Sequence, residues 1–207
     1  MKIGVIGAGF IGRALAQLAL AAGHEVMLSN SRGPQTMSSV LSGIRGVKVG
    51  SAQDAAQFGD VVLVAIPFEH YRSIPAQWLE GKTILDPNNY YPERDGHFPA
   101  LDRFETTTSR LLAEHFSHSK VVKVFNAIFA TDLTEHARPH GAPDRRALPV
   151  AADDAGAKAQ VIGLLDELGF DAVDAGNLDD SWRFERAKPA YCVPLDQAGL
   201  RAALAAA

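Results

Sequence analysis

The sequence predicts an α/β fold: a doubly wound parallel sheet with extra strands and helices at its C-terminal end. Short runs of β-branched residues alternate with longer segments of helical periodicity along the 207 residues. That alternation is typical of parallel strands joined by crossover helices. Turn and cap residues separate the runs. We expect one domain over residues 1–207, with a small C-terminal extension from about residue 145.

Seven or eight strands are expected. The fourth, residues 61–66, is apolar without alternation, as a strand buried on both faces should be. Pro67 ends this strand and Pro87 ends the next, because proline has no N–H to donate to a neighbouring strand. The expected strands are 2–6, 25–29, 47–49, 61–66, 83–86, 120–125, 148–151 and 170–174.

Helices are expected where a cap residue precedes an amphipathic segment. Ser51 can cap one helix, Thr107 or Thr108 another, and Asp153 or Asp154 the strongest one. For the aspartates, capping is favoured over a role as a catalytic pair. The expected helices are 10–22, 35–41, 52–58, about 108–116, 155–168 and 200–207, with a polar loop at 88–97 and a loop or loosely wound helix at 131–144.

Composition excludes several classes of partner. The formal net charge is −4 and no long basic run exists, so nucleic acid and anionic membranes are poor candidates. The apolar run at 61–67 is far shorter than the ~20 residues that span a bilayer. The first residues lack the pattern of a secretory signal, and the single cysteine, Cys192, cannot form an internal disulfide. We therefore expect a cytoplasmic protein.

A glycine-rich turn follows the first expected strand and opens the first expected helix. It reads Gly7-Ala8-Gly9-Phe10-Ile11-Gly12, the fingerprint of a Rossmann-type dinucleotide site. Gly7 permits the sharp turn, Gly9 lets the backbone approach a pyrophosphate, and Gly12 lets the helix pack closely on the strand. The helix N-terminus offers N–H groups to the anion. The alternative is a purely structural turn with no nucleotide.

The end of the second strand favours NADP over NAD. A site for NAD carries an acid there, which binds the ribose hydroxyls, whereas this chain has Asn30, Ser31 and Arg32. A guanidinium can bind a 2′-phosphate through two N–H groups, and Ser31 can donate a hydroxyl hydrogen bond. The alternative is a solvated turn.

With these residues placed, the chain resembles the NADP oxidoreductases related to the archaeal NADPH-dependent reductases of the deazaflavin coenzyme F420. The resemblance is carried by segments 7–12, 31–32, 65–70, 121–126 and 171–176. It implies hydride transfer between NADP(H) and a second bound molecule. The loop 86–96 departs from the archaeal pattern and is similar to that of bacterial relatives with unassigned substrates.

The resemblance also implies roles for residues at matching positions. The backbone of Ala8 to Ile11 would hold the pyrophosphate, and Ser31 with Arg32 the 2′-phosphate. The residues expected beside the ribose and the nicotinamide are Ile66, Pro67, His70, Asn88, Asn126 and Ala127.

Several other side chains have open interpretations. His70 could contact the cofactor or, as a weak catalytic candidate, protonate a substrate. The segment 88–91, Asn-Asn-Tyr-Tyr, could hold a polar substrate or simply form a turn. His115 and His118 lack an evident third ligand, so a solvated surface is favoured over a metal site. Trp182, Phe184 and Tyr191 are expected to cover apolar surface. Alternatively, they could belong to a substrate lid or to a dimer contact.

We therefore expect an NADPH-dependent oxidoreductase whose acceptor is a deazaflavin, a flavin-like molecule or a small carbonyl or imine. The chain lacks the Tyr-x-x-x-Lys, H-E-x-x-H and G-x-S-x-G motifs, which disfavours short-chain dehydrogenase, zincin and serine hydrolase chemistry. We expect no bound metal, and we expect the protein to form a homodimer. The alternative function is an NADPH-binding sensor or redox-partner module without turnover of its own.

Overall fold

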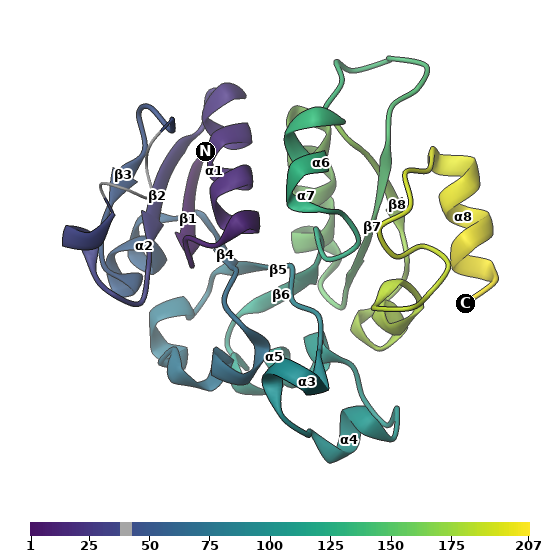
Figure 1. Ribbon diagram of the computed structural model, residues 1–207, viewed down its shortest axis with the longest axis horizontal. Coiled ribbons are helices and arrows are strands. Elements are labelled where there is room, and N and C mark those ends of the chain that lie inside the picture. Colours follow the sequence, from purple (N-terminus) through teal and green to yellow (C-terminus); the bar gives the residue numbers. More distant parts are fainter. Residues whose placement is uncertain (38–42) are drawn as a thin grey trace.

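Eight strands form one sheet in the order β3-β2-β1-β4-β5-β6-β7-β8 (Figure 1). The computed structural model describes residues 1–37 and 43–207. The first six strands pair in parallel, and β8 pairs in parallel with β7. The strands are β1 (Lys2–Ile6), β2 (Glu25–Ser29), β3 (Lys48–Val49), β4 (Val61–Val64), β5 (Thr83–Asp86), β6 (Lys120–Lys123), β7 (Ala147–Ala152) and β8 (Asp171–Asp174). The predicted doubly wound α/β fold is confirmed.

One junction departs from the expected parallel arrangement. β7 runs antiparallel to β6, with Val122 opposite Ala152 and Lys123 opposite Ala151. The connection between these two strands, residues 124–146, contains the short helix α6 (Ala130–Glu135). The chain leaves this connection so that it enters β7 in the opposite direction.

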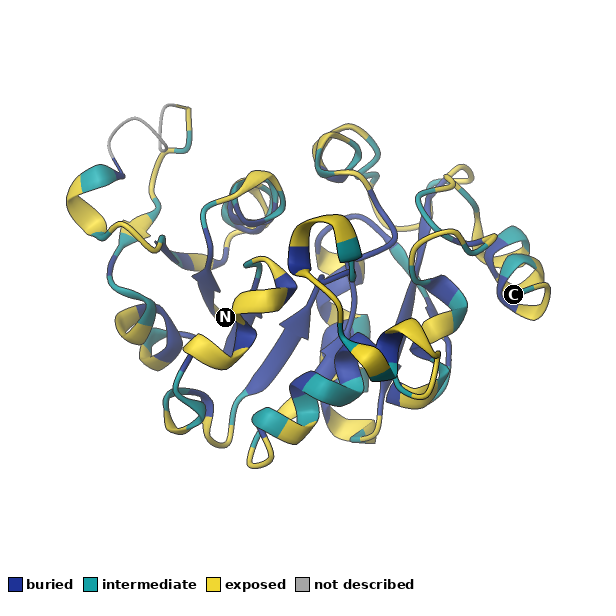
Figure 2. Cartoon of the chain, turned by 60° about the horizontal axis from the view of Figure 1, so that its bottom comes forward, coloured by how far each residue is buried: buried dark blue, intermediate teal, exposed yellow. Residues whose placement is uncertain are grey.

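Helices cover both faces of the sheet. One face carries α1 (Phe10–Ala21), α6 and α7 (Ala155–Glu167), whose apolar residues share a core cluster with β1, β2 and β7. The other carries α2 (Ala52–Phe58) and α5 (Thr108–His115). Figure 2 shows the buried strands between helices whose outer surfaces are exposed. The remaining helical segments are α3 (Pro92–Asp95), α4 (Pro99–Asp102), α8 (Gln197–Ala205) and the 3-10 turns η1 (Pro34–Thr36), η2 (Phe68–Ser73), η3 (Ala76–Leu79) and η4 (Leu178–Phe184).

The predicted caps are confirmed. Ser51 accepts the Asp54 N–H in a capping box, Thr107 accepts the Arg110 N–H, and Asp154 accepts the Ala157 N–H. These side chains satisfy amide groups that a helix start leaves without partners. The sequence therefore placed the cap at Ser51 to the residue, and the structure selects Thr107 over Thr108 and Asp154 over Asp153.

Other boundaries need correction. β6 stops at Lys123 because Phe125 has a φ of 64°, outside the strand region. The expected loop 88–97 contains α3, and the terminal helix starts at residue 197, where Asp196 caps it. Of the helix expected at 35–41, the structure places residues 35 and 36 in η1, and residues 38–41 lie outside the described residues.

Among residues 1–37 and 43–207, no helix is long and apolar enough to cross a membrane.

Candidate functional site

Two adjoining cavities lie along the carboxyl ends of the central strands, where open α/β sheets bind ligands. The Arg32 cavity measures about 510 Å³ and follows β1, β2 and β4. The Asn88 cavity measures about 370 Å³ and follows β4, β5 and β6. They share Gly9 and residues 65–67. A separate groove of about 840 Å³ lies around Phe104 and Trp182, away from the glycine turn.

The glycine turn is shaped to admit an anion. Gly7 has a φ of 111°, a conformation that L side chains rarely adopt. A Cβ on Gly9 would meet nothing within 4 Å, so it would project into open space beside the start of α1. No side chain caps that helix. A Cβ on Gly12 would lie 2.0 Å from the Gly7 carbonyl oxygen, so Gly12 serves helix packing and lines neither cavity.

The turn after β2 presents a basic side chain at the rim of the Arg32 cavity. Asn30 holds the turn: its Oδ1 accepts the Arg32 N–H at 3.1 Å and its Nδ2 donates to Thr36 Oγ1 at 2.9 Å. Ser31 and Arg32 are exposed and line the cavity. Within the described part of the chain, the Arg32 guanidinium makes no ion pair or hydrogen bond. This end of β2 is therefore ready for an anionic ligand.

Ile66 and Pro67 form the wall that the two cavities share. η2 begins directly after Pro67, whose carbonyl oxygen accepts the His70 N–H at 3.0 Å. The His70 side chain is 60% exposed and lines the Arg32 cavity, but not the Asn88 cavity. His70 therefore lies at the Arg32 end of the cleft and not in the Asn88 cavity.

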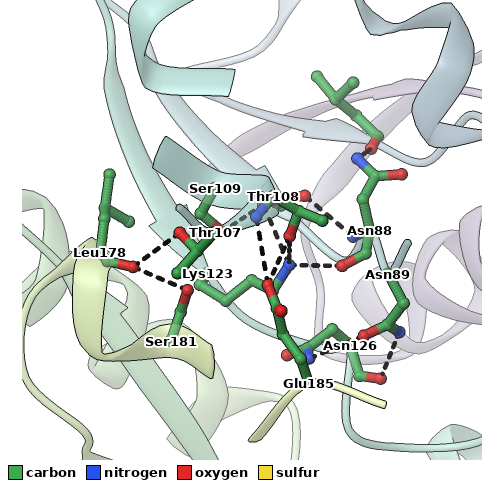
Figure 3. Close-up of polar contacts among 12 residues, drawn as sticks. Asn88, Asn89, Thr107, Thr108, Ser109, Lys123, Asn126, Leu178, Ser181 and Glu185 are labelled. Atoms are coloured by element: carbon green, nitrogen blue, oxygen red, sulfur yellow. Dashed lines mark hydrogen bonds and ion pairs between the residues drawn. The ribbon is translucent and has the colours of Figure 1, made fainter. Parts of the chain in front are cut away.

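Three asparagines line the Asn88 cavity and are bonded to the protein on their other side. Asn88 Nδ2 donates to the Val64 carbonyl oxygen at 3.1 Å, and Asn89 Nδ2 to the Asn126 carbonyl oxygen at 2.9 Å. Asn126 Nδ2 donates to Asn89 Oδ1 (Figure 3) and to the Phe184 carbonyl oxygen. Asn126 Oδ1 is buried without a partner among the described residues.

A buried ion pair fixes the loop that carries Asn88. Lys123 and Asp86 are both fully buried, with Nζ 3.4 Å from Oδ2. Lys123 Nζ also donates to Thr108 Oγ1 at 2.7 Å and to the Asn88 carbonyl oxygen (Figure 3). Asp86 accepts the Asn88 N–H at 2.9 Å and the Ser109 hydroxyl at 2.6 Å. The pair thus holds both backbone polar groups of Asn88.

Sequence reasoning missed this ion pair. The available signal was a lone lysine within the apolar run Val121-Val122-Lys123-Val124-Phe125 of a central strand. A buried lysine needs an acid and hydrogen-bond acceptors, and Asp86 lies at the end of the adjacent strand, opposite Lys123.

The aromatic residues of the loop and tail divide between two places. Tyr91 and Tyr191 line the Asn88 cavity with their hydroxyl oxygens 2.7 Å apart. Tyr90 turns away to the Phe104 groove, where its hydroxyl donates to Asp102 Oδ1 at 2.7 Å. Of the polar segment 88–91, residues 88, 89 and 91 therefore face the cavity and Tyr90 does not.

Ala127 lines neither cavity; its carbonyl oxygen accepts the Cys192 N–H at 3.2 Å and thereby holds the tail that carries Tyr191. Phe184 is fully buried, and Trp182 is 40% exposed beside the separate groove.

The remaining titratable candidates have structural surroundings. His115 Nε2 lies 2.9 Å from the Ile74 carbonyl oxygen, and His118 is exposed. Asp153 forms an ion pair with Arg110 at 2.7 Å, while Asp154 caps α7. Over residues 1–37 and 43–207, no three His, Cys, Asp or Glu side chains gather in a way that could hold a metal ion.

Comparison with known proteins finds a family model and related structures that match this chain. Residues 2–90 match the model of the family described as coenzyme F420-dependent NADP oxidoreductase. Over 61 residues the chain is 38% identical to the Escherichia coli K12 protein YjhV, a stretch that spans 44% of that relative. The crystal structure of a provisionally named F420-dependent NADP reductase from Arthrobacter sp. FB24 superposes with a TM-score of 0.74 and 29% identity over 88% of this chain and 87% of that one.

A second crystal structure extends the likeness to almost the whole chain. Hypothetical protein SMa0349 from Sinorhizobium meliloti is 31% identical and superposes with a TM-score of 0.79 over 94% of both chains. Since the family model and this full-length likeness agree, the chain belongs to the F420-dependent NADP oxidoreductases, a family of NAD(P)-binding oxidoreductases with a Rossmann-type fold.

Proposed function

We propose that this protein is an NADPH-dependent oxidoreductase that transfers hydride between NADP(H), bound across the two cavities, and an acceptor in the Asn88 cavity. The observation that carries the proposal is the turn after β2. It presents an exposed guanidinium at a cavity rim and holds no carboxylate among residues 28–33. A 2′-phosphate would be attracted to Arg32, and an acid at this place would repel it.

The residues along the cleft fit the successive parts of such a cofactor. The open space at Gly9 and the uncapped start of α1 suit a pyrophosphate. The unpaired acceptor Asn126 Oδ1 suits a group with N–H donors, such as a carboxamide. When bound, the cofactor supplies the hydride, and the protein supplies geometry. Ile66 and Pro67, at the junction of the cavities, would set the path between the two ends.

The acceptor belongs to one of three classes: a deazaflavin, a flavin-like ring or a small carbonyl or imine. Each would lie against Asn88, Asn89 and Asn126, in the cavity next to the glycine turn. The buried Lys123–Asp86 pair keeps this wall in place because it bonds both backbone groups of Asn88.

The test is a fluorescence titration of the protein with NADPH and NADH, repeated with Arg32→Ala. Charge-assisted hydrogen bonds contribute about 1.5–3 kcal/mol, so the NADPH dissociation constant should rise roughly 10- to 100-fold. The NADH constant should hardly change. Arg72→Ala is the matched control, because Arg72 is exposed on η2 and lines neither cavity.

Two results would contradict the proposal. Equal affinity for NADPH and NADH, unchanged by Arg32→Ala, would remove the assignment of the 2′-phosphate to this turn. Tight NADPH binding without oxidation of NADPH by any acceptor of the three classes would instead indicate a sensor.

A further inference from the structure

Two phenols from distant parts of the chain meet at the wall of the Asn88 cavity. Tyr91 directly precedes α3, and Tyr191 lies in the tail before α8. Their hydroxyl oxygens are 2.7 Å apart, and both side chains are half-buried. Among the described residues lining this cavity, these two are the only ones that carry a hydroxyl group. The fold therefore brings a pair of O–H groups to the place where the acceptor is proposed to bind.

The pair has one more O–H hydrogen than the hydrogen bond between the two phenols uses. Two phenols carry two O–H hydrogens, and the bond between them uses one. In the part of the chain that the structure describes, the Tyr91 hydroxyl has no other hydrogen-bond partner, and the Tyr191 hydroxyl interacts only with the neighbouring Cys192 thiol besides. When Tyr191 donates to Tyr91, the Tyr91 hydrogen is left for a molecule in the cavity.

The other polar groups at this wall are less suited to give up a proton. Asn88 and Asn89 each use their amide nitrogen to hold a backbone carbonyl, and amides are not acids. Arg94 binds Asp95 through Nε and Nη2. Burial raises the pKa of the Cys192 thiol, and a thiol is a weak hydrogen-bond donor.

Two guanidinium groups lie against the Tyr91 ring. The guanidinium carbons of Arg94 and Arg186 lie 4.8 and 4.9 Å from the centre of the Tyr91 ring. Positive charge at this distance stabilises a phenolate as it forms. Burial, followed by the bond to Tyr91, raises the pKa of Tyr191 above its ordinary value, so Tyr191 stays protonated and keeps the hydrogen bond to Tyr91. The carboxylates facing these arginines, Asp95 and Glu93, are ion-paired with them.

We infer that the Tyr91–Tyr191 pair is the proton donor of the reaction and that the acceptor is a small carbonyl or imine compound. This inference rests on the proposed function. The acceptor carbon gains the hydride that NADPH supplies, and its π electron pair moves to oxygen or nitrogen. A phenol O–H bond breaks as the new O–H or N–H bond forms, which gives an alcohol or an amine. The phenolate then recovers its proton from water.

A deazaflavin acceptor would not call for this arrangement. Hydride transfer between two stacked rings needs no acid at the moment of transfer. A carbonyl or imine develops its negative charge on one atom and benefits from a positioned acid by about 100- to 10,000-fold. The spare phenol proton therefore favours the third acceptor class over the first two.

The experiment compares the wild type with Tyr91→Phe, Tyr191→Phe and the double variant, since phenylalanine keeps the ring and removes only the hydroxyl. The probes are benzaldehyde and 3,4-dihydroisoquinoline as acceptors, with NADPH oxidation followed by absorbance. The double variant should lose at least about 100-fold in kcat, with the NADPH dissociation constant unchanged within threefold. Each single variant should lose less, because one phenol remains.

Tyr90→Phe is the matched control, since it removes the neighbouring hydroxyl, which faces the Phe104 groove; its kcat should equal that of the wild type. A readout independent of turnover is the affinity of benzamide, an unreactive carbonyl, for the protein saturated with NADPH. Calorimetry should show this affinity falling at least tenfold in the double variant.

Three results would overturn the inference. The double variant could keep more than a third of the wild-type kcat, the double variant could bind benzamide as tightly as the wild type, or the wild type could bind NADPH but reduce neither probe. In each case NADPH binding and its dependence on Arg32 would stand, so only the acceptor assignment would fall. Failure to bind NADPH would instead remove the proposed function itself.

Discussion

Replacing Lys123 by methionine should strongly destabilise the protein. The Lys123 and Asp86 side chains are both 0% exposed, and Lys123 bonds to Asp86, Asn88 and Thr108. Methionine has similar length and flexibility but no charge. The Asp86 carboxylate would keep the Ser109 hydroxyl and the Asn88 N–H and lose its only counter-charge among the described residues.

The expected magnitude follows from the loss of one partner of a buried pair, which costs about 3–5 kcal/mol. For a chain of this size, 1 kcal/mol lowers the midpoint of thermal unfolding by about 2–4 °C. Lys123→Met should therefore lower Tm by about 6–20 °C at pH 7. Adding Asp86→Asn removes the uncompensated charge, so the double variant should lose less than the sum of the two single losses, by about 0.5–3 kcal/mol.

The assay is thermal unfolding followed by circular dichroism. Lys120→Met is the matched control: the same residue type on the same strand, half-exposed and in a surface pair with Asp154, should shift Tm by no more than roughly 3 °C. The reasoning is refuted if Lys123→Met shifts Tm no further than this control, or if the losses of Lys123→Met and Asp86→Asn simply add.

Three further substitutions test the cleft and the helix starts. Gly9→Ala should weaken NADPH binding at least tenfold at unchanged Tm, because the added methyl meets only the open space of the cleft; a lower Tm with unchanged affinity would contradict this. Gly12→Ala should instead lower Tm and leave the affinity of the folded protein for NADPH unchanged. Its Cβ would lie 2.0 Å from the Gly7 carbonyl oxygen, and overpacking costs about 1–3 kcal/mol. Asp154→Ala should lower Tm at pH 7. The hydrogen bond from the Ala157 N–H, and to a lesser extent that from Lys120, holds the pKa of Asp154 below its ordinary 3.8. The stabilisation by Asp154 is therefore full above pH 3.8 and is lost as pH falls through the folded-state pKa. A difference in Tm between wild type and Asp154→Ala that is as large at pH 2 as at pH 7 would contradict this prediction.

The sequence was most informative where local chemistry decides the structure. The first strand, the glycine turn and the first helix form one continuous unit, and their predicted and observed starts coincide. Helix starts were equally predictable, because Ser51, Thr107 and Asp154 each bond an amide within three residues of themselves. Such contacts depend only on neighbours in the chain.

Contacts between distant segments could not be predicted in the same way. Lys123 and Asp86 are 37 residues apart, and Tyr91 and Tyr191 are 100 apart. Their meeting depends on which strands become neighbours and on where the tail returns. The antiparallel direction of β7 belongs to the same class, since it follows from how residues 124–146 travel across the fold. Strand ends were missed for a related reason: the turn at Phe125, with its positive φ, carries no glycine to signal it.

The family model covers all of one cavity and only part of the other. The family model spans residues 2–90, which include every lining residue of the Arg32 cavity. Much of the Asn88 cavity lies beyond that span, in Phe125, Asn126, Tyr191 and their neighbours. Its wall depends on Ala127, whose carbonyl oxygen holds the tail at Cys192. A family match confined to the first half of the chain therefore supports the assignment of the cofactor. The acceptor must be inferred from side chains of the C-terminal half, which returns to the cleft.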